Sequence, residues 1–192
     1  MIKQQSELIA YVGPMFSGKT SALLMTLERF KYQGRHIYAF KPTIDDRYSQ
    51  SNIVSHMGWE LPAVQISTGK ELIEALMIQM PEGELKERCV VAVDEMFMIP
   101  GIAEQLIWLY KNDVTVVVST LDLSSSCVPF EEVVKILPFA TTTKKFMSVC
   151  SVCGADAHYT WKKSNGIDDE IIAVGGSEIY EPRCKQHHTC MI

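Results

Sequence analysis

Apolar runs and amphipathic segments alternate along roughly the first 140 residues of the chain. Short continuous apolar runs are typical of parallel strands covered on both faces, and they occupy Leu8–Val12, His36–Phe40, Cys89–Val93 and Val114–Thr120. Apolar residues at helical spacing predict helices between them, at Ser21–Tyr32, Lys70–Met80 and Pro100–Asn112, with a short helix through Val134. This alternation predicts an α/β fold, in which helices cover both faces of a parallel sheet.

Two regions depart from this pattern. Residues 51–69 are rich in Ser, Gly and Pro, and we expect an irregular loop there, with residues 55–58 close to the ligand. Pro42 is expected to end the regular pairing of the second strand. From residue 144 onward only short strand-like pieces remain, Ala157–Lys162 and Glu170–Val174, followed by a Gly175-Gly176 turn. We therefore expect two domains, one over residues 1–143 and a small one over residues 144–192.

The segment between the first strand and the first helix matches the G-x-x-x-x-G-K-[ST] pattern of a phosphate-binding loop (P-loop). Backbone N–H groups in such a loop face one concavity at a helix N-terminus, where the aligned peptide dipoles attract an anion. Lys19 would reach the outer phosphates of ATP, and the Thr20 hydroxyl would hold Mg²⁺. The loop residues expected to bind ATP are Gly13, Pro14, Met15, Phe16, Ser17, Gly18, Lys19 and Thr20.

Acidic and basic residues follow two of the predicted strands. Asp94 and Glu95 come directly after the most apolar run; we expect Asp94 to bind Mg²⁺ and Glu95 to act as a general base. Asp45 and Arg47 lie after the second strand, where loops of an open α/β sheet surround the ligand, and we expect Asp45 to belong to the ATP- and Mg²⁺-binding residues. Arg47 is either a phosphate clamp or a solvated charge in an Asp-Asp-Arg turn.

Cysteine spacing in the last part of the chain predicts a structural zinc site. Cys150 and Cys153 form a C-x-x-C pair, and Cys184 and His187 repeat the spacing about 30 residues later. Two such pairs supply a tetrahedral S/N ligand set, and a module this small needs a metal to hold its fold. His188 and Cys190 are close enough to compete with His187 for the fourth position.

Composition restricts the partners and the compartment. The chain has 18 basic and 23 acidic residues, a net charge of −5, so we expect neither nucleic acid nor membrane as a partner. No apolar run reaches membrane-spanning length, and the first strand begins after seven residues, so we expect no signal peptide. With six cysteines beside a nucleotide-binding loop, we expect a cytoplasmic protein with reduced thiols, some of them on metal.

The order of these motifs resembles the type II (cellular) thymidine kinases over essentially the whole chain. The phosphate loop, Asp94-Glu95 and the cysteine pairs all match the family. Further matches are Lys41-Pro42 with Asp45-x-Arg47-Tyr48, Ser55-His56, Leu121-Asp122 with Pro129-Phe130, and Gly175-Gly176 with Tyr180. The resemblance implies transfer of the γ-phosphoryl group of ATP to the 5′-hydroxyl of thymidine. Glu95 would then be the base, Arg47 and Lys19 would attend the phosphates, and Thr20 and Asp94 would attend Mg²⁺.

The same resemblance implies how the nucleoside is held. The family closes a lasso loop over the nucleoside and binds the base largely with backbone groups, which corresponds to residues 159–180 of the small zinc-binding domain. The implied nucleoside-binding residues are Met15, Phe97, Met98, Leu121, Phe130, Val174, Gly176 and Tyr180. A homotetramer and feedback inhibition by thymidine triphosphate are further implications of the resemblance.

This sequence departs from the family pattern on the nucleoside side. Met96–Ile99 replaces a small residue, Gln and two aromatics, Ser125 replaces an aromatic, and Trp161-Lys162-Lys163 replaces Lys-Arg-Leu. Deoxyuridine is therefore a plausible second substrate, and a deoxynucleoside kinase of altered base specificity is an alternative. A P-loop ATPase with a structural zinc ribbon is another. A zinc-ribbon module for nucleic acid is disfavoured by its few basic residues, and intact Lys19, Asp94 and Glu95 argue against a chain without turnover.

Overall fold

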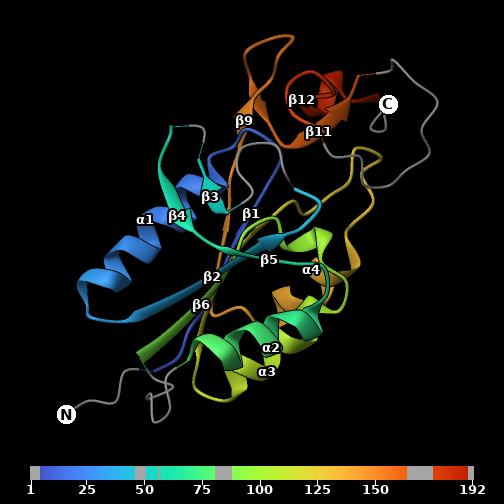
Figure 1. Cartoon of the computed structure of the whole chain (residues 1–192). Helices are drawn as coiled ribbons and strands as arrows, with labels where there is room; N and C mark the ends of the chain where they lie inside the picture. The colour runs from blue at the N-terminus through green and yellow to red at the C-terminus, as the bar shows by residue number, and fades with distance from the viewer. Residues whose placement is uncertain (1–4, 46–50, 56, 81–87, 164–174, 190–192) are drawn as a thin grey trace.

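The computed structural model describes residues 5–45, 51–55, 57–80, 88–163 and 175–189. Its centre is a six-stranded parallel sheet with the strand order β5-β2-β6-β7-β1-β8 (Figure 1). The strands are β1 (Leu8–Val12), β2 (His36–Pro42), β5 (Val64–Ile66), β6 (Cys89–Val93), β7 (Thr115–Thr120) and β8 (Thr142–Lys145). The predicted α/β fold with a parallel sheet is confirmed.

Helices cover both faces of the sheet. Helix α1 (Lys19–Tyr32) packs on one face, where Leu23, Leu27 and Phe30 belong to the same apolar cluster as Ile9 of β1. Helices α2 (Gly69–Gln79), α3 (Ile102–Lys111) and α4 (Glu131–Ile136) cover the other face (Figure 1). Because successive strand residues point to opposite faces, a fully buried strand such as β6 serves both layers. Val90 and Val91, which are adjacent residues of β6, accordingly belong to different apolar clusters.

Several boundaries differ from the sequence-based expectations. Strand β2 continues through Pro42, because beyond its pairing with β6 it pairs with β5 as far as Pro42↔Ile66, and a strand end tolerates the missing N–H. Residues 51–69 are more regular than expected: they contain the antiparallel strands β3 (Asn52–Val54) and β4 (Glu60–Pro62), and β5. Helix α3 starts at Ile102 rather than Pro100, since Gly101 before it has a left-handed backbone (φ 70°).

The residues after β8 form a smaller lobe of two antiparallel pairs, β9 (Ser148–Val149) with β10 (Asp156–Ala157) and β11 (Tyr159–Lys162) with β12 (Tyr180–Arg183). In Figure 1 this lobe lies beyond the end of β1 at which α1 begins. The strand expected at Glu170–Val174 lies outside the described residues.

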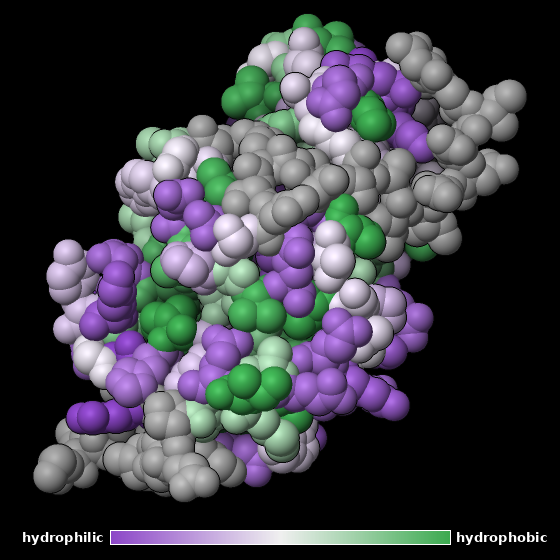
Figure 2. All heavy atoms as spheres, in the orientation of Figure 1, coloured by the Kyte–Doolittle hydropathy of each residue, from purple (hydrophilic) through white to green (hydrophobic). Residues whose placement is uncertain are grey.

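Short 3₁₀ turns lie at Met96–Met98, Leu137–Phe139 and Lys185–His187. On the face in view, hydrophobic side chains form small groups between hydrophilic ones (Figure 2). None of the helices among the described residues combines the length and the hydropathy needed to cross a bilayer.

Candidate active site

The loop between β1 and α1 depends on two glycines. Gly13 and Gly18 have φ values of 142° and 84°, which side-chain-bearing residues rarely adopt. A Cβ at Gly13 would lie 2.5 Å from the backbone oxygen of Phe146, so the chain entering the small lobe approaches the loop as closely as a glycine allows. The sequence motif therefore folds into a compact turn held from both sides.

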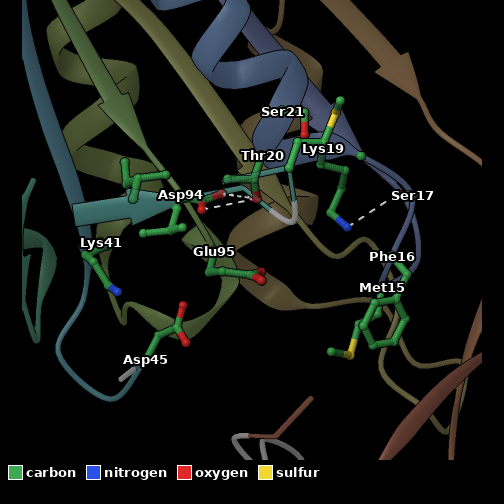
Figure 3. Close-up of a pocket in the computed structure, with 14 residues that line it drawn as sticks. Met15, Phe16, Ser17, Lys19, Thr20, Ser21, Lys41, Asp45, Asp94 and Glu95 are labelled. Carbon is green, nitrogen blue, oxygen red and sulfur yellow. Dashed lines mark hydrogen bonds between the residues drawn. The ribbon is translucent and has the colours of Figure 1, made fainter. Parts of the chain in front are cut away.

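The lysine of this loop is buried. Lys19 Nζ donates a hydrogen bond to the carbonyl oxygen of Pro14 at 2.6 Å and lies 3.5 Å from Ser17 Oγ (Figure 3). Ser17 Oγ donates to the same Pro14 oxygen at 2.8 Å. The Pro14 carbonyl thus anchors the ammonium group at the mouth of the turn.

Asp94 follows β6 and points toward the start of α1. Thr20 Oγ1 lies 3.2 Å from both oxygens of the carboxyl group, and Ser119 at the end of β7 donates a second hydrogen bond to it. Burial raises the pKa of Asp94 to about 7, and the neighbouring carboxylates of Glu95 and Asp45 add to the rise, against the opposing effects of Ser119 and Lys19. Asp94 and Thr20 therefore offer paired oxygen ligands in a place where excess negative charge favours a cation.

Glu95 has a left-handed backbone, with φ 48° and ψ 43°. This conformation is uncommon for a residue with a side chain and persists only where the surroundings impose it. It ends β6 sharply and directs the carboxyl group into the space between Lys41 and Asp45 on one side and Met15 on the other (Figure 3). The Oε2 atom is buried. The backbone thus places a second carboxyl group beside Asp94, facing the loop.

These side chains surround one cavity of about 260 Å³. Its walls come from the loop, from the ends of β2 and β6, and from the β3–β4 hairpin: Met15, Phe16, Ser17, Gly18, Lys19, Thr20, Ser21, Lys41, Asp45, Ile53, Val54, Met57, Asp94 and Glu95. Residues 55–58 were expected near the ligand, and Met57 does line the cavity, whereas His56 lies outside the described residues. Arg47 also lies outside them.

Sequence reasoning missed two polar side chains here. Lys41 is buried in the cavity wall and Ser119 binds Asp94, yet neither was assigned a role. Both lie at the carboxyl ends of their strands, where an open α/β sheet binds its ligands. That rule would have been sufficient to find them.

Most residues expected around a nucleoside belong to a single apolar cluster: Met15, Phe97, Met98, Leu121, Phe130 and Tyr180. The rings of Phe97 and Phe130 are 4.4 Å apart, and of this group Met15 also lines the cavity. Gly176 lies in the turn before β12, where its carbonyl oxygen accepts from the N–H of Tyr180 at 2.9 Å. Val174 lies outside the described residues.

A second cluster of polar side chains lies in the small lobe. One ligand atom from each of Cys150, Cys153, Cys184 and His187 lies within 4.8 Å of all the others. The Sγ atoms of Cys153 and Cys184 are 3.8 Å apart, and His187 Nδ1 is 3.7 Å from Cys150 Sγ. Ligands about 2.3 Å from a tetrahedral zinc ion lie roughly 3.7 Å apart, so this donor set fits zinc.

The rest of the lobe supports the same ligand set. Burial opposes ionisation of the Cys150 thiol, but backbone hydrogen bonds from Cys184, Val152 and Cys153 lower its pKa to about 6. His188 turns away from the cluster, with Nε2 3.1 Å from the carbonyl oxygen of Thr160. Cys190 lies outside the described residues. Among the described residues, His187 is therefore the fourth member of the cluster.

The sequence as a whole matches a known protein family. The family model described as "TK: Thymidine kinase" matches residues 6–188, which is nearly the whole chain. The match includes the loop, the cavity walls and all four members of the Cys/His cluster.

Proposed function

The chain belongs to the thymidine kinase family and is a thymidine kinase, and we propose that its cavity between β1, β2 and β6 transfers the γ-phosphoryl group of ATP to the 5′-hydroxyl of thymidine. One observation carries this assignment of the site. Asp94 and Glu95 at the end of β6 face the Gly13–Thr20 loop across a single cavity, with Thr20 already hydrogen-bonded to Asp94. Phosphoryl transfer needs this combination of a phosphate cradle, a cation site and a carboxylate.

The loop binds the phosphates of ATP. The backbone N–H groups at the start of α1 are oriented by the helix, so they attract phosphate oxygens without reorganisation. Lys19 keeps one donor on the Pro14 carbonyl and offers another to the outer phosphates as a charge-assisted hydrogen bond. Arg47, on the segment after β2, assists as a phosphate clamp.

Thr20 and Asp94 hold Mg²⁺, because a hydroxyl and a carboxylate supply the hard oxygen ligands that it prefers. When bound, Mg²⁺ neutralises charge on the phosphate oxygens during transfer. The raised pKa of Asp94 supports this role, since three crowded carboxyl groups need a cation to remain ionised together at neutral pH.

Glu95 is the general base. Its carboxylate accepts the proton of the 5′-hydroxyl while that oxygen forms a bond to the γ-phosphorus. The bond between the γ-phosphorus and the oxygen that bridges the β- and γ-phosphates breaks, and ADP leaves with the electron pair of that bond. A buried carboxylate held by a left-handed backbone keeps a fixed position for this step.

The apolar cluster that includes Met15, Phe97 and Phe130 contacts the nucleoside from one side. By the family resemblance, the lasso over residues 159–180 holds the base largely with backbone groups, and Val174 and Gly176 are its proposed nucleoside-binding residues. Apolar walls discriminate weakly against the loss of one methyl group, so deoxyuridine is the expected second substrate.

The other proposals concern the whole protein. Zinc on Cys150, Cys153, Cys184 and His187 stabilises a zinc-binding domain over residues 144–192, next to a P-loop domain over residues 1–143. A homotetramer with feedback inhibition by thymidine triphosphate follows from the family resemblance, and a cytoplasmic location follows from cysteines expected to be reduced beside a nucleotide-binding loop. Light scattering on the purified protein and cell fractionation test the assembly and the compartment.

The test of the activity uses purified protein, Mg·ATP and a panel of nucleosides, with products separated by chromatography. We expect thymidine monophosphate and ADP in equal amounts. ADP and inorganic phosphate without any nucleoside monophosphate would instead support the ATPase alternative.

A matched pair of variants tests the base. Glu95→Gln is expected to bind ATP as the wild type does and to lose roughly 10²- to 10⁴-fold in kcat, the usual contribution of a general base. Glu104→Gln, which neutralises an exposed carboxylate on α3, serves as the control. Turnover within a few-fold of wild type in Glu95→Gln would remove Glu95 from this role.

A further inference from the structure

A chain of buried hydrogen bonds joins the small lobe to the loop between β1 and α1. The Met15 N–H donates to Thr160 Oγ1 at 3.0 Å, across 145 residues of sequence. His188 Nε2 lies 3.1 Å from the carbonyl oxygen of Thr160, and Cys127 Sγ lies 3.6 Å from His188 Nδ1. Three segments that are remote in sequence therefore meet at Thr160, and one of them is the loop.

The chemistry of the donors and acceptors gives this chain a direction. A carbonyl oxygen only accepts, so His188 Nε2 carries the proton and donates it to Thr160. The opposite ring nitrogen, Nδ1, then faces the Cys127 thiol. His188 is fully buried and lies outside the Cys/His cluster, so metal coordination does not account for its orientation.

At the loop, this series of hydrogen bonds holds one peptide group, the one between Pro14 and Met15. The Met15 N–H and the Pro14 carbonyl belong to the same peptide, and its other end accepts hydrogen bonds from Lys19 Nζ at 2.6 Å and Ser17 Oγ at 2.8 Å. A planar peptide held at both ends cannot rotate. The hydroxyl of Thr160 therefore determines the position of the carbonyl oxygen that anchors the Lys19 ammonium.

We infer that Thr160 and His188 are positioning residues for ATP binding, acting through the Pro14–Met15 peptide on Lys19. The inference deepens the proposed function and rests on it, because it requires that the loop bind phosphates. A second contact from the small lobe also holds the loop: Ser148 Oγ donates to the carbonyl oxygen of Phe16 at 3.1 Å. The small lobe thus organises the ATP side of the site as well as covering the nucleoside.

The test measures ATP affinity in the absence of nucleoside, with a fluorescent ATP analogue and Mg²⁺, so that no contact of Thr160 with a nucleoside contributes. Thr160→Val keeps the shape of the side chain and leaves the buried Met15 N–H without its acceptor. We expect its Kd to rise about tenfold, because the Pro14–Met15 peptide is no longer held in place and has to be ordered, together with Lys19, when ATP binds. Thr160→Ser retains the hydroxyl and is expected to stay within about twofold of wild type.

His188 is tested by a second pair of variants. His188→Leu is expected to raise the Kd about threefold, while His188→Gln, which keeps a donor toward Thr160, restores it. In the double variant Thr160→Val/His188→Leu, the Kd should rise no further than in Thr160→Val alone, because both residues act through one peptide. Zinc content is measured in parallel and should equal that of wild type in every variant.

A positioning role and a purely structural one give different results. If Thr160→Val lowers the melting temperature but leaves the Kd for ATP within about twofold of wild type, the inference is wrong, whatever the His188 variants do. Wild-type protein that binds no ATP would overturn the proposed function itself, and this inference with it.

Discussion

Asp94 should destabilise the Mg²⁺-free protein at neutral pH, and its replacement by Asn should stabilise it. The carboxyl group is buried, and its pKa in the folded protein is about 7, against 3.8 for an ordinary aspartate. Asn has nearly the same shape and carries no charge. The variant Asp94→Asn is therefore expected to be more stable than wild type and, since it loses the proposed magnesium ligand, inactive.

The size of the effect follows from proton linkage. Because the folded pKa is raised, the folded state binds the proton more tightly than the unfolded state does. Stability from this group is fully present below pH 4 and is lost as the pH rises through 7. A difference of about three pKa units corresponds to roughly 4 kcal/mol in total, of which roughly 2.5 kcal/mol falls between pH 5 and pH 8.

Urea unfolding at pH 5, 6, 7 and 8 measures this difference, in magnesium-free buffer without a chelator, so that the Cys/His cluster keeps its metal. The free-energy advantage of Asp94→Asn over wild type should grow by roughly 2.5 kcal/mol across that range. Glu104→Gln removes an exposed charge and should run parallel to wild type. Parallel profiles for wild type and Asp94→Asn would refute a pKa near 7 and the crowding of carboxyl groups that explains it.

Three further predictions follow from the same site and its surroundings. Binding of Mg·ATP at pH 7 should release about 0.5 proton from Asp94, which calorimetry in two buffers of different ionisation enthalpy measures; no release would show that Asp94 is already ionised. Cys184→Ser should lower the zinc content well below the one ion per chain expected of wild type and lower the melting temperature, whereas Val152→Ala, a change at an exposed neighbour in the lobe, should do neither. Gly13→Ala should abolish ATP binding and lower the free energy of unfolding in urea by roughly 2 kcal/mol or more, because the new Cβ clashes with Phe146 and the backbone φ is unfavourable for alanine. Gly34→Ala is the control: its φ of 73° is also unfavourable, but the space around it is open, so this variant should keep ATP binding.

The sequence predicted the sheet best where burial is complete. Strands β1 and β6 have the expected bounds because their apolar runs are continuous. Strand β8 was missed, since an exposed edge strand of Thr and Lys leaves no apolar run. Strands β3, β4 and β5 were missed because three residues are too few for an alternating pattern to be recognised.

The residues of the candidate site likewise divide into those that local sequence patterns predicted and those that they did not. Local motifs were sufficient to bring Lys19, Thr20 and Asp94 to one cavity, since each lies at a strand end or a helix start. Cysteine spacing identified the Cys/His cluster but left His187, His188 and Cys190 as alternatives; among the described residues, His187 joins the cluster because of how the chain turns after Cys184. The contact between Thr160 and Met15 has no local signal, because it joins residues 145 positions apart.

That separation also orders events during synthesis. The loop is made among the first residues of the chain, yet Gly13 reaches its final surroundings only when Phe146 is present, and Met15 only when Thr160 is. At roughly 5–20 residues per second, the ribosome needs roughly 7–30 seconds to cover that distance. The nascent chain therefore carries the loop sequence long before the loop has its final shape, and under the proposed function ATP binding begins only after the small lobe has been made.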